Sequence, residues 1–250
     1  QGVGTTPTLA SANLNLVSHC SRLSQGEVFP ATVSRHAATT YGGRMGVQWI
    51  FDGHIAGIGT ASGLRAVVGL WRESPFGPFA DAMVELPSGR RILLAPTAEV
   101  AGFIAAVYTF DETRIVDVDA RHAGGTLTVD AGHLRLRAAL GARTVLGSAA
   151  RLIPRPLAVH PRWLRAVSPF AALLSPGVRT AGTAGGGRRE YYGVTDLHRI
   201  DAATVSWHGV DAGPLADVRP AVGFGFSSVP PQPGIVRVRT TVEGDPVTRR

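Results

Sequence analysis

The sequence of 250 residues contains no lysine, so all 25 of its Lys/Arg residues are arginines. Without a side-chain amine, the chain has no residue that forms a Schiff base with a carbonyl substrate. A P-loop is excluded for the same reason, because its lysine must reach the phosphates of a bound nucleotide. Imine catalysis and P-loop nucleotide hydrolysis are therefore two chemistries that this sequence does not support.

Cysteine is nearly absent as well, since Cys20 is the only one. A single thiol excludes an intrachain disulfide framework and a multi-thiolate metal site. It also favours the cytoplasm as the compartment, because thiols stay reduced there. The eight histidines show neither the HxH nor the HExxH spacing of metal ligands, and no GxSxG elbow of a serine hydrolase occurs. We therefore expect no metal and no cofactor.

Long apolar runs are missing too: none reaches the ~18 residues that a membrane span requires, and no signal-peptide pattern is present. The formal charge of +7 is compatible with an acidic partner, but the scattered arginines favour biased composition and no nucleic-acid binding. Peripheral membrane contact is an alternative for the arginines around Trp163, which are Arg151, Arg155, Arg162 and Arg165. The favoured interpretation is a helix that covers one end of the fold with its arginines in water.

Residues 1–44 differ in composition from the rest of the chain. They are rich in Ser, Thr, Ala and Gly and show weak periodicity, which is typical of disorder. Met45 is the first methionine and directly precedes the first apolar segment, so we expect 1–44 to be a disordered or non-native extension. An ordinary arm that packs across the domain is the alternative. No linker divides the remainder, which indicates one domain, 45–242, and a frayed tail, 243–250.

From residue 64 onward the pattern is typical of antiparallel strands with few helices. Short β-rich runs joined by Pro/Gly turns predict strands at residues 64–71, 79–86, 90–95, 113–121, 126–129, 133–140, 191–199, 203–207, 223–227 and 235–242. A helix is predicted after Pro96, with Thr97 as N-cap and with an apolar face made of Val100, Phe103, Ile104 and Val107. A second short helix is predicted within 161–174. The fold class is therefore α+β, mainly antiparallel β with one or two short helices, as a barrel or a sheet stack.

The segment GIGTASG, residues 57–63, allows a second interpretation. A glycine-rich turn between a strand and a helix binds phosphate in dinucleotide-binding folds. However, Asp52, Gly53 and His54 interrupt the apolar strand that such a fold needs, and no alternation of strands and helices follows. We favour a glycine-rich turn that leads into the strand at 64–71. A nucleotide-dependent oxidoreductase is the less favoured alternative.

The strand at 79–86 offers the clearest candidate site. Alternate residues of a strand face opposite sides, which predicts a core face of Ala80, Ala82, Val84 and Leu86. The other face alternates large apolar groups with carboxylates, as the pocket wall of a barrel does, and consists of Phe79, Asp81, Met83 and Glu85. Asp81 is the candidate acid or base, because a carboxyl in such a wall has a raised pKa. The other three are candidate ligand contacts. The solvent side of an edge hairpin is an equally favoured alternative.

A second glycine-rich segment, Gly185–Gly187, precedes Arg188 and Arg189. Successive backbone N–H groups in such a run can cradle an anion. A mobile loop is the more common outcome, and we favour it here.

Two short segments resemble motifs of the acetoacetate decarboxylase family. SPFGPFAD, residues 74–81, is similar to that family's entry of a small residue, a glycine, an aromatic residue and a carboxylate, which leads by a hairpin to a short helix. GPLADVRPAVGFGFSSVPPQPGIV, residues 213–236, looks like its closing segment. Across residues 64–238 the resemblance implies a cone-shaped antiparallel β-barrel with a central pocket. Asp81 would stand where the family has a pocket glutamate.

The stretch equivalent to the family's Schiff-base lysine is YTFDE, residues 108–112. It has no lysine, and Asp111 and Glu112 reverse the local charge, so the family's mechanism is excluded. By position, the resemblance makes Tyr108 and Asp111 further candidate ligand-binding residues. The resulting hypothesis is a small-molecule-binding β-barrel that acts on a small organic acid or ketone without an imine. A non-catalytic carrier of an apolar ligand is the alternative.

Overall fold

The computed structural model describes residues 37–41, 44–174 and 177–244. The chain divides into two compact units, residues 1–31 and residues 32–250, and all described residues belong to the second. No helix within the described residues is long and apolar enough to cross a membrane.

Most of the expected N-terminal extension, 1–44, lies outside the described residues. Its described part consists of the strand β1 (Ala37–Tyr41) and the first residue of β2 (Arg44–Thr60). Of the expected tail, the first two residues end the strand β14 (Gly234–Gly244), and residues 245–250 lie outside the described part.

Within the described residues, fourteen strands form one sheet. Its hydrogen-bonded path runs through β6 (Glu112–Ile115), β5 (Arg91–Ala95), β4 (Phe79–Glu85), β3 (Arg65–Glu73), β2, β14, β11 (Arg189–Trp207), β9 (Leu134–Arg143), β8 (Thr126–Ala131) and β7 (Val118–Ala123). Short strands pair beside this path, namely β1, β10 (Ala181–Thr183), β12 (Val210–Asp211) and β13 (Leu215–Ala216). The β5–β6 ladder is parallel and the others are antiparallel.

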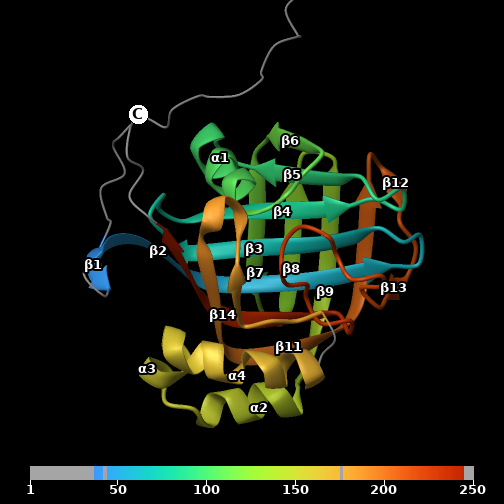
Figure 1. The fold of residues 1–250 in the computed structure, drawn as a ribbon. Coiled ribbons are helices and arrows are strands. Elements are labelled where there is room, and N and C mark those ends of the chain that lie inside the picture. Colours follow the sequence, from blue (N-terminus) through green and yellow to red (C-terminus); the bar gives the residue numbers. More distant parts are fainter. Residues whose placement is uncertain (1–36, 42–43, 175–176, 245–250) are drawn as a thin grey trace, which may run out of the picture. The chain divides into compact units, whose positions relative to one another are not determined.

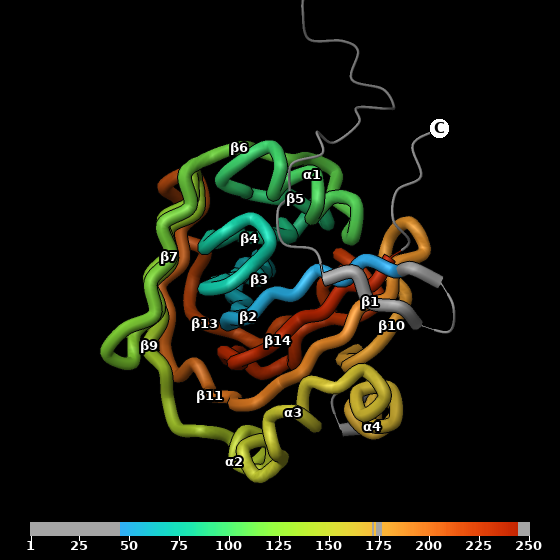
Figure 2. The backbone as a smooth tube through the Cα atoms, turned by 90° about the vertical axis from the view of Figure 1, so that its left-hand side faces the viewer, coloured from blue at the N-terminus to red at the C-terminus, as the bar shows by residue number. Residues whose placement is uncertain are grey.

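The sheet curls back on itself, as Figures 1 and 2 show. Strands β2–β5 cross in front of β7–β9 in Figure 1, and side chains from both halves share one core. Val84 of β4, for example, packs in the same buried cluster as Leu127 of β8 and Leu134 of β9. The expected mainly antiparallel, strand-rich fold is confirmed as a curled half-barrel. Closure of the sheet into a cone stays a prediction.

The helix α1 (Ala98–Val107) has the expected N-cap, since the side chain of Thr97 accepts a hydrogen bond from the backbone N–H of Val100 at 3.2 Å. It ends at Val107, with Tyr108 as its C-cap. Its apolar face packs against β5 and the aromatic residues beside it.

Three further helices, α2 (Val145–Leu152), α3 (Arg155–Ala158) and α4 (Pro161–Leu174), lie together beside β11 (Figure 1). Only α4 was expected from the sequence. Thr144 caps α2 by accepting a hydrogen bond from the N–H of Gly147 at 2.9 Å. A Cβ on Gly147 would collide with the carbonyl oxygen of Leu197, so this glycine permits α2 to lie directly on β11.

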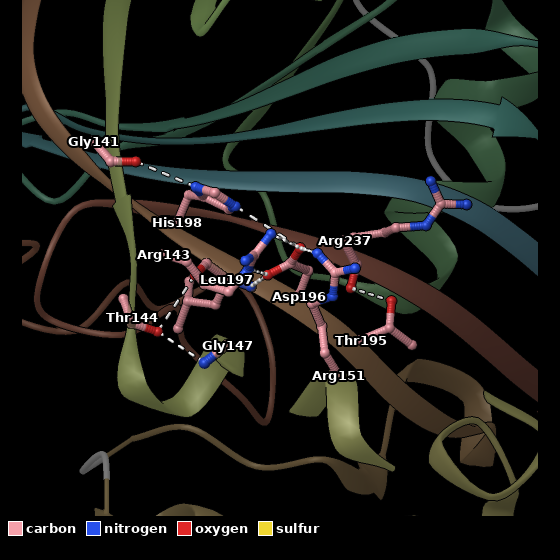
Figure 3. A network of polar contacts seen from close by, with 10 residues as sticks. All are labelled: Gly141, Arg143, Thr144, Gly147, Arg151, Thr195, Asp196, Leu197, His198 and Arg237. Carbon is pink, nitrogen blue, oxygen red and sulfur yellow. Dashed lines mark hydrogen bonds and ion pairs between the residues drawn. The ribbon is translucent and has the colours of Figure 1, made fainter. Parts of the chain in front are cut away.

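Asp196 of β11 joins this helical layer to the sheet (Figure 3). It accepts hydrogen bonds from Arg143 at 2.8 and 3.2 Å, and Arg151 and His198 lie 3.8 Å from it. Burial alone would raise the pKa of Asp196, but the hydrogen bonds from Arg143 and from the backbone of Leu197 outweigh burial and lower it. A carboxylate so fully engaged by its neighbours has a structural role.

Four predicted strands differ from the observed ones. The run 113–121 is divided between β6 and β7, because β6 pairs with β5 while β7 pairs with β8. The runs 191–199 and 203–207 are one strand, β11, with irregular register near residues 194–202. Residues 223–227 form no strand.

The dinucleotide interpretation of residues 57–63 is wrong. Gly57 and Gly59 lie within β2, which pairs antiparallel with β3 through a turn at residues 61–64. A phosphate-binding turn would lead from a strand into a helix, and here it leads into the neighbouring strand of a hairpin.

Candidate functional site

The face of β4 that carries Phe79, Asp81, Met83 and Glu85 is neither exposed nor turned into the core between the two halves of the sheet. Ala82 and Val84, on the opposite face, belong to that core, as expected. The candidate face is covered by α1 and by residues 218–229, which we call the strap. Because Asp81 and Glu85 on this face are buried, the solvent-side alternative is wrong. We call this buried side of β2, β3, β4, β11 and β14 the covered face.

Asp81 is buried on the covered face, and the Nε1–H of Trp71 donates a hydrogen bond to its Oδ1 at 2.9 Å. Burial raises the pKa of Asp81 to about 7, and the bond from Trp71 opposes that rise only in part. A carboxyl with such a pKa holds its proton for much of the time near neutrality, which is what a general acid requires.

Gly69 creates the space in which Asp81 and Trp71 meet. It lies directly opposite Asp81 in the β3–β4 ladder. A Cβ on Gly69 would collide with Oδ1 of Asp81 and would come within 2.6 Å of Nε1 of Trp71. The glycine is therefore needed for the hydrogen bond between these two side chains.

Replacing Gly69 by alanine is expected to lower the free energy of unfolding by about 3 kcal/mol, because overpacking a buried site costs that order of energy. Urea unfolding followed by tryptophan fluorescence measures the change. Gly46→Ala of β2 is the control, because its Cβ would meet nothing closer than the carbonyl oxygen of Gly244 at 3.7 Å. Equal stability of the two variants would contradict the tight fit at Gly69.

A second carboxyl, Glu190 of β11, is only 1% exposed and lies on the same covered face. The hydroxyl of Tyr108 donates to its Oε1 at 2.5 Å, and the hydroxyls of Tyr108 and Tyr192 lie 2.8 Å apart. Either hydroxyl can donate in the contact between Tyr108 and Tyr192, and both tyrosines hydrogen-bond to Glu190 in their effect on its pKa. Burial raises the pKa of Glu190 to about 7, against the hydrogen bonds from the tyrosines.

Two buried polar atoms in or next to this group of hydrogen-bonded side chains lack a protein partner among the described residues. They are Oε2 of Glu190 and Oγ1 of Thr240. Tyr192 lies directly opposite Thr240 in the β11–β14 ladder, so Thr240 faces the same side as Glu190 and Tyr192. A buried polar atom without a hydrogen bond is costly. Both atoms are therefore available to a polar group of a ligand.

Glu85 is held in place on the covered face. It pairs with Arg65 at 3.0 Å and accepts a hydrogen bond from the N–H of Gly223 at 2.8 Å. Arg65 also donates to the carbonyl oxygen of Pro220 at 2.9 Å. This buried ion pair fastens the strap to the sheet, so Glu85 has no free oxygen directed at a ligand.

The remaining sequence candidates lie in different surroundings. Phe79 and Met83 pack under α1, and Met83 also contacts the strap. Tyr108 joins the group around Glu190. Asp111 does not join it, because it lies at the surface and binds Arg91 at 2.9 Å, and this pairing lowers the pKa of Asp111 to about 2.

Glu190, Tyr192 and Thr240 were missed by sequence reasoning. One local signal was available: Glu190 directly precedes the predicted strand 191–199 and alternates with Tyr192, as Asp81 does with Met83 in β4. The contact between Tyr108 and Glu190 joins residues 82 positions apart, and no periodicity in the sequence encodes such a contact.

Two cavities open outside the covered face. One, of about 290 Å³, borders the strap and shares Val218 and Val229 with the cluster that packs against Met83 and Tyr108. The other, of about 540 Å³, lies between α4 and β10–β11. Within the described residues, no group of three His, Cys, Asp or Glu side chains is arranged to hold a metal ion.

Comparison with known proteins gave one structural likeness to report. The chain matches no family model and no curated protein. It is similar to the crystal structure of acetoacetate decarboxylase from Legionella pneumophila, with a TM-score of 0.39 and 10% sequence identity, over 78% of this chain and 84% of that one.

Proposed function

We propose that the protein binds a small organic acid or ketone on the covered face and transfers a proton to and from it through Glu190, without an imine. The observation that carries this proposal is the state of Glu190. One of its carboxyl oxygens is held by Tyr108, and the other is buried without a protein partner among the described residues. A pKa of about 7 suits a group that must both accept and return a proton near neutrality.

The reaction that fits these groups is proton abstraction from the carbon next to a carbonyl. The C–H bond breaks, its proton passes to Oε2 of Glu190, and the electron pair moves to the carbonyl oxygen as an enolate. The hydroxyl of Thr240 is the donor for that oxygen, because it lies on the same face and has no described acceptor. Return of the proton to carbon completes the exchange, and no amine is needed.

A ligand can reach Glu190 only if the strap moves. The cavity of about 290 Å³ borders Val218 and Val229, and these strap residues pack against the covered face. Outward movement of the strap would connect that cavity with Tyr108, which donates to Glu190. Gly223 and Gly225 lie in the strap, and a Cβ on Gly225 would meet the ring of Tyr108 at 2.8 Å.

Replacing Glu190 by glutamine is expected to reduce proton exchange at least about 100-fold, the usual contribution of general acid–base catalysis. The measurement is incorporation of deuterium from D₂O next to the carbonyl in a panel of small ketones and keto acids, followed by NMR. Thr240→Val should reduce the rate less, because one neutral hydrogen bond is lost. Glu99→Gln, an exposed carboxyl on α1, is the control and should leave the rate unchanged.

The outcomes separate the rival functions. Loss of exchange in Asp81→Asn with full exchange in Glu190→Gln would transfer the acid–base role to Asp81. Retention of a ligand in native mass spectrometry, with no exchange by the unaltered protein, would favour a non-catalytic carrier.

A further inference from the structure

A single stretch of the chain has a larger formal positive charge than the net +7 of the whole sequence. Residues 131–189 contain ten of the 25 arginines and none of the 18 carboxylates, so the rest of the chain has more carboxylates than arginines. This stretch includes α2, α3, α4 and β10. Arg135, Arg143, Arg151 and Arg155 lie within 4.0 Å of carboxylates from outside the stretch, whereas the other six form no ion pair with a described residue.

The same layer exposes large apolar side chains. Six of the nine exposed large hydrophobic residues within the described part lie on its helices: Val145, Leu146, Leu152, Leu157, Phe170 and Leu173. Val145, Leu152 and Leu173 are 89%, 86% and 80% exposed. Scattered exposed apolar residues are ordinary on a protein surface, but this concentration on three adjacent helices is typical of an interaction surface.

The orientation of α2 is the reverse of that in an ordinary surface helix. Its two buried residues are Gly147 and Ala150, whereas Val145, Leu146 and Leu152 face outward. A helix that served only to cover the sheet would bury its large apolar residues. In α4, Leu164 is buried, and Arg162, Arg165, Phe170 and Leu173 are exposed at helical spacing. Each of these two helices therefore turns apolar groups outward next to arginines.

An arginine-lined cavity of about 540 Å³ opens between α4 and the strands β10 and β11. Arg165 of α4, Arg179 and Arg189 line it, together with Ser168, Thr183 and Tyr191. None of the three arginines forms an ion pair with a described residue, whereas Arg155 is engaged by Asp52 at 2.9 Å. Burial raises the pKa of the Tyr191 hydroxyl, and the nearby carboxylate of Glu243 raises it further. The positive charges of Arg165 and Arg189 oppose this rise. Unpaired guanidinium groups around a cavity favour a phosphate-bearing anion.

We propose that the layer α2–α4 binds the surface of an anionic lipid bilayer. Its exposed leucines, valine and phenylalanine enter the boundary between headgroups and acyl chains, and the arginine-lined cavity receives a lipid phosphate. A basic surface with exposed apolar side chains has the two components of interfacial membrane binding. This site is distinct from the covered face and does not depend on the function proposed for Glu190.

Two other occupants fit less well. A second copy of the chain, related by a two-fold axis, would place arginines against arginines, because such an interface uses the same patch on both subunits. A nucleic acid would use the arginines but would gain nothing from Val145, Leu152 and Leu173, because single-stranded bases stack on aromatic rings.

Cosedimentation with vesicles tests the proposal. The unaltered protein should bind vesicles that contain phosphatidylglycerol and should bind phosphatidylcholine vesicles weakly, with binding to the former falling as salt is added. The double variant Leu152→Ser, Leu173→Ser should bind at least about 10-fold more weakly, because it removes two exposed apolar side chains that the bound bilayer would bury. Val210→Ser, at a residue 69% exposed on β12, is the control and should bind as the unaltered protein does.

The charge component is tested separately. Arg165→Gln with Arg189→Gln should remove the preference for anionic vesicles, and Arg121→Gln, an exposed arginine of β7, should leave it intact. Three results would overturn the proposal: equal binding by the unaltered protein and the apolar double variant, binding to single-stranded RNA in place of vesicles, or a dimer in sedimentation velocity that the apolar double variant abolishes. Circular dichroism establishes that each variant is folded.

Discussion

Replacing Glu85 by glutamine is expected to lower the free energy of unfolding by about 3–5 kcal/mol. Glutamine keeps the shape of the side chain but removes the charge that neutralises Arg65, which is buried in β3. Arginine does not give up its proton inside a protein, so the variant must bury an unpaired cation. Urea unfolding at neutral pH measures the loss.

An exposed pair in the same strand supplies a matched control. Arg72 and Glu73 form an ion pair at 3.0 Å, the same distance as Arg65 and Glu85, but both side chains are 67% exposed. Glu73→Gln should change the stability by less than about 1 kcal/mol, because water screens such a pair. The double variant Arg65→Met, Glu85→Leu should recover much of the loss, since an apolar pair of similar volume is often as stable as a buried ion pair. Equal losses in Glu85→Gln and Glu73→Gln would show that burial does not govern the pair.

The sequence predicts which residues of β4 share a face, but it does not predict what covers the polar face. Alternation correctly assigned Ala82 and Val84 to the core. What covers Asp81 and Glu85 depends on the strap and on α1, which lie far away in sequence: Glu85 meets Gly223 across 138 positions. Local periodicity contains no information about such contacts. The same face therefore remained open to two interpretations, a pocket wall or a solvent-exposed edge.

The helix α2 escaped prediction for a different reason. Helical periodicity is recognised by large apolar residues on the buried face, and α2 buries Gly147 and Ala150 instead. Its outward-facing Val145, Leu146 and Leu152 therefore give a misleading pattern. The property that hid this helix from sequence analysis is the one that makes its exposed face a candidate membrane-binding surface.

Replacing Asp81 by asparagine is expected to make the protein more stable than the unaltered one at pH 8, and equally stable near pH 4. Burial raises the pKa of folded Asp81 to about 7 from 3.8, so between these values the folded state keeps a proton that the unfolded chain releases. The stability due to this group is complete below pH ~4 and is lost as the pH rises to ~7, by about 4 kcal/mol in total. Asparagine does not ionise, and its oxygen still accepts the hydrogen bond from Trp71.

Urea unfolding at several pH values separates this effect from a general change in stability. Asp111→Asn is the control, because Arg91 lowers the pKa of Asp111 to about 2. The stability due to Asp111 is present above pH ~4 and is lost only at lower pH, so its variant should differ from the unaltered protein by a constant amount between pH 4 and 8. Glu190→Gln should behave like Asp81→Asn, since burial raises the pKa of Glu190 in the same direction. Parallel pH curves for the unaltered protein and Asp81→Asn would mean that Asp81 ionises freely when folded, which would remove its suitability as a proton donor near neutrality.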